Sequence, residues 1–144
     1  TASLAGLGGV AGLGIYCTTK FAVVGLSESL HHDLVARGSA VGVSVLCPGF
    51  VQARIGESNR NAPASVAEWT ETPTAQATAE FAKALTDAGI APEVVADAVR
   101  DAIVDDTFFI VPHEHAAVAT TRARAESMTG GDAPAIDPAR AVQP

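Results

Sequence analysis

The chain has 144 residues, of which 48% are hydrophobic and 17% charged, a composition typical of one globular domain with a buried core. Its net charge of −7 argues against a nucleic-acid partner or an anionic membrane surface. The sequence contains neither an apolar run long enough to span a membrane nor a signal-peptide pattern. Its two cysteines, Cys17 and Cys47, fall in apolar segments, which favours free buried thiols and predicts a cytoplasmic protein.

The first 14 residues contain five glycines and are interpreted as a flexible loop. A dinucleotide-phosphate loop would need a strand directly before its glycines, and only a few residues precede them here. Residues 15–37 then show a helical period, and Gly38 is well placed to end that helix. The apolar positions that recur at spacings of three, four and four are Val23, Leu26, Leu30 and Leu34.

A second stripe on the same helix consists of small residues, Thr18, Ala22, Gly25 and Ser29. Small side chains let another helix or a sheet approach closely. We expect a homo-oligomer on this basis, and packing within the chain explains the stripe equally well.

Tyr16 and Lys20 lie four residues apart at the start of this helix. That spacing places the two side chains on one face, with Cβ atoms roughly 5–6 Å apart. A nearby ammonium favours the ionised form of a phenol and so suits it to proton transfer near neutral pH. A packed ring beside a solvated lysine is the alternative interpretation of the same spacing.

Residues 41–46 are almost continuously apolar and rich in valine, as in a strand buried on both faces of a parallel sheet. Cys47, Pro48 and Gly49 end it, because proline cannot extend the ladder and glycine permits a sharp turn. Ligands of open α/β sheets bind beyond this end of the strands.

Residues 52–91 form a long insertion between two expected strands and contain the only tryptophan, Trp69. Thr74 is placed to cap a helix that carries Phe81 and Leu85 inward and stops at Gly89. A substrate lid and a peripheral insertion are both compatible with this segment.

Pro92 opens a second helix, followed by a short strand over residues 108–111. We expect a last helix over residues 116–125 and a disordered tail over residues 129–144. Alternating helices and strands predict an α/β domain over residues 1–128. Because two parallel strands need covered faces and paired edges, we expect the sequence to be incomplete.

Three features together resemble the C-terminal half of the short-chain dehydrogenase/reductase family. They are the segment Thr1-Ala2-Ser3, the Tyr16-x-x-x-Lys20 motif with the Phe-Ala-Val-Val-Gly-Leu-Ser-Glu-Ser-Leu run after it, and Pro48-Gly49-Phe50-Val51. The resemblance covers about residues 1–115. It implies a Rossmann-like doubly wound parallel sheet whose N-terminal cofactor-binding half is absent from this sequence.

The resemblance also implies roles for particular residues. Tyr16 is the expected general acid/base, and Ser3 orients the substrate carbonyl or hydroxyl. Lys20 is expected to bind the nicotinamide ribose and to favour the phenolate of Tyr16. The residues expected to line the nicotinamide of NAD or NADP are Pro48, Gly49 and Val51.

The expected activity is therefore interconversion of an alcohol and a ketone or aldehyde by hydride transfer. Related families use the same Tyr/Lys pair for epimerisation or dehydration, and a non-catalytic α/β scaffold is the third alternative. Ala53 stands where the family often has threonine, which removes one hydroxyl contact to the cofactor. The histidines have no ligand partners at the usual spacing, so we expect no metal site.

Overall fold

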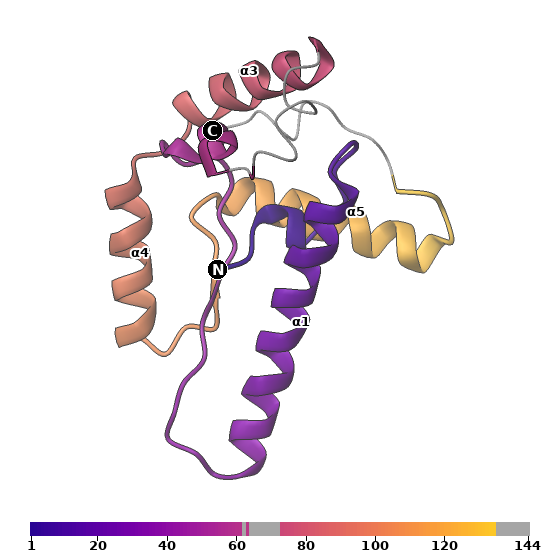
Figure 1. Ribbon diagram of the computed structural model, residues 1–144. Helices are drawn as coiled ribbons and strands as arrows, with labels where there is room; N and C mark the ends of the chain where they lie inside the picture. The colour runs from indigo at the N-terminus through magenta and orange to yellow at the C-terminus, as the bar shows by residue number, and fades with distance from the viewer. Residues whose placement is uncertain (62, 64–72, 135–144) are drawn as a thin grey trace. The chain divides into compact units, whose positions relative to one another are not determined.

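The computed structural model describes residues 1–61, 63 and 73–134 (Figure 1). The chain divides into two compact units, one of Thr1–Gly49 with the chain from Val94 onward and the other of Phe50–Glu93. Among the residues described, no helix has the length and apolar character needed to cross a membrane.

The first unit contains a small parallel sheet with helices before, between and after its strands. Its elements are the 3₁₀ helix η1 (Leu4–Gly6), α1 (Gly14–Ala36), β1 (Val45–Leu46), β2 (Phe109–Ile110), α5 (Glu114–Gly130) and most of α4 (Pro92–Val104). β1 pairs with β2 in parallel, with Val45 opposite Phe109. The expected α/β class with a parallel sheet is confirmed.

α1 is the longest helix and ends as its sequence predicts (Figure 1). Gly38 has a left-handed φ of 63°, a conformation that glycine adopts without steric cost. The N–H of Ser39 bonds the carbonyl of Leu34 at 3.0 Å, and that of Gly38 bonds Val35 at 3.0 Å. This pair of bonds is a Schellman motif, which satisfies carbonyls left free at the helix end.

The core of the first unit brings together the chain start, α1, β1 and α5. Its buried residues are Ala2, Leu7, Val24, Val45, Cys47 and Ala117. Both cysteines are buried and free, as expected. The segment that carries Ser3 and the strand that precedes Pro48 are therefore anchored in the same core.

Both strands are shorter than the sequence predicts. β1 covers only the last two residues of the expected strand over 41–46, and Val41 is 66% exposed. A strand is defined by its hydrogen-bonded neighbour, and within the described residues the ladder of β1 with β2 starts at Val45. β2 likewise covers two of the four residues expected.

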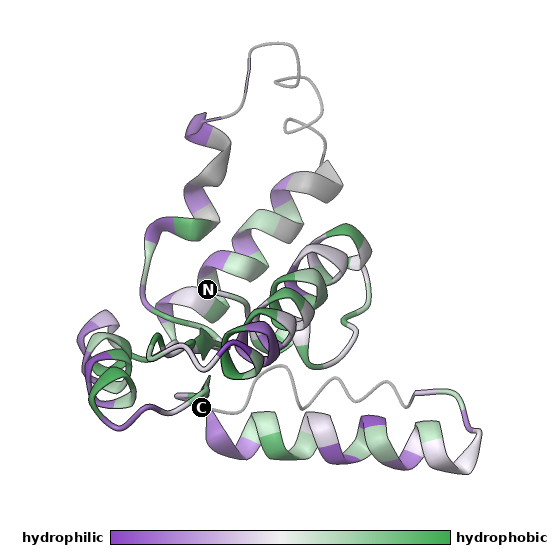
Figure 2. Cartoon of the chain, turned by 90° about the horizontal axis from the view of Figure 1, so that it is seen from below, coloured by the Kyte–Doolittle hydropathy of each residue, from purple (hydrophilic) through white to green (hydrophobic). Residues whose placement is uncertain are grey.

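Several apolar residues that periodicity assigns to a buried face are exposed instead. Leu26 of α1 is 70% exposed, Ile103 of α4 is also exposed, and α1 buries only Cys17 and Val24. Periodicity identifies residues that share a face, but it does not establish that another element covers that face. In Figure 2 hydrophobic and hydrophilic residues alternate in bands along α5, which explains its weak sequence signature.

α5 is longer than expected at both ends. It begins at Glu114 and continues to Gly130, so Thr129 and Gly130 are helical although the sequence assigns them to a tail. Gly131, with a φ of 76°, ends the helix. The rest of the expected tail from residue 135 lies outside the described residues.

The second unit contains the 3₁₀ segment η2 (Arg54–Asn61) and α3 (Pro73–Asp87). Val51 pairs with Ile90 in an isolated parallel bridge. α3 starts at Pro73, so Thr74 lies inside the helix and the expected cap is wrong. Phe81 is 62% exposed, contrary to its expected inward position. Trp69 lies outside the described residues.

Candidate active site

Tyr16 and Lys20 lie side by side in the first turns of α1. The Lys20 Nζ is 5.4 Å from the centroid of the Tyr16 ring, within the range of a cation–π contact. The same Nζ donates to the carbonyl of Thr1 at 3.4 Å. Tyr16 is 36% exposed, so its ring is accessible rather than sealed in the core. Lys20 therefore connects the tyrosine to the segment that leads into Ser3.

Ser3 lies at the N-terminus of η1, where its Oγ accepts the N–H of Ala5 at 3.2 Å. Its hydroxyl donates to the carbonyl of Pro48 at 3.4 Å. The N–H of Ala2 donates to the carbonyl of Leu46 in β1 at 2.7 Å, and this backbone bond holds the neighbouring serine against the strand. The N–H of Leu4 also donates to the Pro48 carbonyl, at 2.9 Å. Ser3 thus flanks the C-terminal end of β1. Its expected role in orienting the substrate stays a prediction.

Close packing fixes the relation between η1 and α1. A Cβ placed on Gly6 would lie 2.7 Å from the carbonyl oxygen of Lys20 and 3.2 Å from a side-chain carbon of Val24. Real Cβ atoms do not approach a backbone oxygen so closely. The absence of a side chain at this glycine therefore lets the Ser3 segment pack directly on the turn that presents Lys20.

Sequence reasoning missed the contact made by His113. The Nδ1 of this half-buried residue accepts the N–H of Gly49 at 3.0 Å, whereas from the sequence the histidines were considered only as metal ligands. Its position directly after β2 was the available signal, but using that signal requires the pairing of two strands about 60 residues apart.

Val51 belongs to the second unit, where it forms the bridge with Ile90. The next residue, Gln52, donates its N–H to the Ile90 carbonyl at 2.9 Å. The expected contact of Val51 with the cofactor stays a prediction.

Beneath the serine, Cys47 is fully buried. Burial raises the pKa of its thiol above the ordinary value of 9.0, and a hydrogen bond from the backbone of Ser3 acts in the opposite direction. A thiol in such surroundings stays protonated near neutral pH and acts as a small apolar group.

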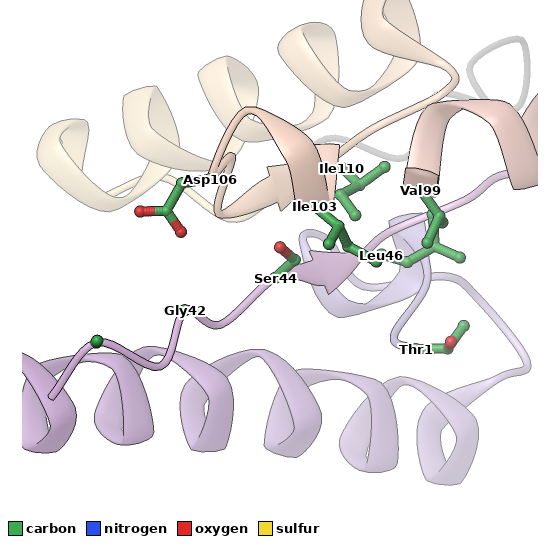
Figure 3. Close-up of a pocket in the computed structure, with 9 residues that line it drawn as sticks. Thr1, Gly42, Ser44, Leu46, Val99, Ile103, Asp106 and Ile110 are labelled. Atoms are coloured by element: carbon green, nitrogen blue, oxygen red, sulfur yellow. The ribbon is translucent and has the colours of Figure 1, made fainter. Parts of the chain in front are cut away.

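Figure 3 shows a hollow of about 570 Å³, and Tyr16 is not among the residues that line it. Its side chains come from β1, β2, α4 and neighbouring loops, and they include Leu46, Val99, Ile103, Asp106 and Ile110. Thr1, whose carbonyl accepts a hydrogen bond from the Lys20 ammonium, also lines the hollow. The lining mixes apolar side chains with polar ones such as Ser44 and Asp106. Among the described residues that line it, no pair of side chains is suited to acid–base or nucleophilic chemistry, so the hollow does not mark the candidate active site.

The parallel strands joined through α4, together with the cluster at the end of β1, define a part of a Rossmann-like α/β domain. Residues 1–64 match the short chain dehydrogenase family. The crystal structure of a short-chain dehydrogenase/reductase from Burkholderia phymatum, in complex with NAD, superposes with a TM-score of 0.85 at 34% identity. That similarity covers 94% of this chain and 49% of the other.

The curated proteins that are similar in sequence include the following two. A CLA biosynthesis dehydrogenase/reductase of Lactiplantibacillus plantarum is 34% identical over 117 residues, covering 78% of this chain and 41% of that protein. A diacetyl reductase [(S)-acetoin forming] of Staphylococcus aureus is 45% identical over 56 residues, covering 39% of this chain and 21% of that protein. The chain thus spans less than half the length of these curated relatives. It belongs to the short-chain dehydrogenase/reductase family.

Proposed function

We propose that the intact protein containing this chain is an NAD(P)-dependent oxidoreductase that interconverts an alcohol and a ketone or aldehyde. The observation that carries the proposal is the placement of Lys20. Its ammonium lies over the ring of Tyr16 and donates to Thr1, two residues before Ser3. Family membership and the NAD complex of the similar Burkholderia phymatum structure support the same proposal.

In the proposed reaction Tyr16 is the general acid/base. Its ring is accessible, and the neighbouring ammonium stabilises negative charge on the phenol oxygen as the proton leaves. The tyrosine gives a proton to a carbonyl oxygen during reduction and takes one from an alcohol during oxidation.

Ser3 is the proposed substrate-orienting residue. Its hydroxyl has one proton, which it donates to the Pro48 carbonyl across a long 3.4 Å contact. A substrate oxygen in reach can compete for this proton, because a contact of that length is weak. The N–H of Ala5 donates to Ser3 Oγ and keeps this oxygen in place while the serine proton moves from the Pro48 carbonyl to the substrate oxygen.

The residues present fit a nicotinamide cofactor. An ammonium has three donors, and Lys20 uses one on Thr1 at 3.4 Å, so it is able to bind the ribose hydroxyls as well. Pro48 and Gly49 would line the ring. When bound, the nicotinamide supplies or accepts the hydride that accompanies the proton at Tyr16.

Replacing Tyr16 by phenylalanine tests the proposal. Tyr16→Phe keeps the ring and removes only the hydroxyl, so kcat should fall by roughly 10²- to 10⁴-fold, the range for loss of a general acid/base. Cofactor binding, measured by quenching or calorimetry, should change little because Lys20 is retained.

Thr18→Val is the matched control. Thr18 is exposed in the same helix, and its hydroxyl bonds only to the backbone carbonyl of Gly14 at 2.9 Å among the described contacts. Removing this hydroxyl should leave kcat close to that of the wild type. Full turnover in Tyr16→Phe would refute the proposed mechanism.

A further inference from the structure

The hydrogen bonds between β1 and β2 continue beyond the two strands through a side chain. The N–H of Val45 donates to the carbonyl of Phe108 at 2.7 Å, and the N–H of Cys47 donates to the carbonyl of Ile110 at 2.8 Å. Alternate residues of a strand face the same neighbour, so the next donor in this series is the N–H of Gly49. It donates to Nδ1 of His113 at 3.0 Å. The imidazole therefore acts as the next acceptor after the carbonyls of the ladder.

This bond acts on the peptide group that also binds Ser3. The Gly49 N–H and the Pro48 carbonyl belong to one planar peptide unit. On the carbonyl side, the unit accepts the N–H of Leu4 at 2.9 Å and the hydroxyl of Ser3 at 3.4 Å. Fixing the N–H on one side therefore sets the direction of the carbonyl on the other.

Close approach between the ring and the backbone makes the contact specific. A Cβ on Gly49 would lie 3.0 Å from two carbon atoms of the His113 ring, closer than nearly all real Cβ contacts. The absence of a side chain at Gly49 lets the ring reach the backbone. Because Nδ1 accepts, a neutral ring carries its proton on Nε2.

We propose that His113 is a positioning residue for the oxidoreductase site, in which its imidazole orients the Pro48–Gly49 peptide and thereby the Ser3 hydroxyl and the nicotinamide-lining turn. The catalytic part rests on the proposed function, because only that reaction gives Ser3 and the turn their roles. The positional part rests on the hydrogen-bond geometry alone.

Amide exchange tests the positional part without cofactor. His113→Phe keeps a ring but has no acceptor at Nδ1, so exchange of the Gly49 N–H, followed by ¹H–¹⁵N NMR, should quicken by about tenfold or more. His113→Asn places an amide oxygen where Nδ1 was and should restore most of the protection. His115→Phe, at an exposed position two residues further on, is the control and should change exchange by less than about twofold.

Kinetics of the intact protein test the catalytic part. In His113→Phe the KM for the cofactor should rise by roughly 5- to 50-fold and kcat should fall, since the partly buried N–H of Gly49 loses its acceptor. His113→Asn should recover most of both constants. A bond that only stabilised the fold would lower the melting temperature and leave KM and kcat of the folded protein unchanged.

The two readouts separate the possible failures. Unchanged Gly49 exchange in His113→Phe would overturn the positioning role, whatever the protein catalyses. Quickened exchange with unchanged KM and kcat would show a purely structural bond and overturn the catalytic part. Failure of the proposed function would appear separately, as full turnover in Tyr16→Phe. Should His113→Phe not fold, His113→Ala supplies the same comparison with less bulk.

Discussion

A methyl group at Gly6 should separate the Ser3 segment from α1. In Gly6→Ala the new Cβ would lie 2.7 Å from the oxygen and 2.9 Å from the carbon of the Lys20 carbonyl. Carbon atoms in favourable contact are about 3.5–4.0 Å apart, so the two segments must move by about 0.5–1 Å. The obstructing atoms are helix backbone, which cannot rotate away as a flexible side chain does. Overpacking of this kind costs about 1–3 kcal/mol.

Gly25→Ala is the matched control, with the same substitution in α1 itself. A Cβ at Gly25 has no heavy atom within 4 Å in the described structure, and the position is exposed. Alanine in an exposed helix interior is more favourable than glycine by about 0.8–1 kcal/mol. The free energies of unfolding of the two variants should therefore differ by about 2–4 kcal/mol, with the wild type between them.

Urea denaturation followed by circular dichroism measures this difference. Gly6→Ala should also weaken the Lys20–Thr1 contact, because the displaced turn carries Lys20. Equal stability of Gly6→Ala and Gly25→Ala would refute the close packing of η1 on α1, and with it the argument that this packing fixes Lys20 near Ser3.

Two further predictions concern Cys47 and Asp106. Burial raises the pKa of the Cys47 thiol above 9.0, so the unfolded chain loses this proton at lower pH than the native protein does. The contribution of the buried thiol to the free energy of unfolding is complete below pH 9. It is lost as the pH rises, by at most about 1.4 kcal/mol per pH unit. The stability gap between the wild type and Cys47→Ala should thus narrow from pH 9 to pH 10.5 in urea titrations, and a constant gap would contradict the reasoning. Asp106 has a φ of 52°, which a β-branched side chain tolerates poorly, so Asp106→Val should lower the free energy of unfolding by about 1–2 kcal/mol. Asp106→Gly should not lower it, and equal loss in both variants would show that strain is not the cause.

The end of α1 and the start of α4 were the most predictable helix boundaries. Gly38 ends α1 by adopting a positive φ, and Pro92 starts α4 because its fixed φ suits a first helical position. Both effects depend on the residue itself, so local sequence suffices to place these two boundaries. α5 lacked such a marker at its start and has no one-sided apolar face, and the sequence underestimated it at both ends. The extent of a strand was not predictable in the same way, because the ladder starts only where a neighbouring strand lies.

The candidate site was predicted unevenly for a related reason. Tyr16 and Lys20 are four residues apart in one helix, so their proximity follows from helix geometry. The family resemblance singled out Ser3 and Pro48 separately, and the hydrogen bond between them was not predicted because the two residues are far apart in the sequence. Nothing in composition or local pattern linked His113 to Gly49, a contact that depends on the register of β1 against β2.

The segment from Val45 to Gly49 works as a longer strand than its two assigned residues suggest, and this explains how the site gains rigidity. Residues 45, 47 and 49 donate toward β2 and His113, whereas residues 46 and 48 accept from the Ser3 segment. This alternation is the period of an extended chain. Pro48 lacks an N–H. In this alternation residue 48 faces the Ser3 segment, so the missing donor lies on that side of the chain and not on the side toward β2. The side toward β2 therefore keeps its three N–H donors, those of residues 45, 47 and 49. The proline thus ends regular pairing beside Ser3, while the Pro48–Gly49 peptide that orients the serine hydroxyl stays hydrogen-bonded.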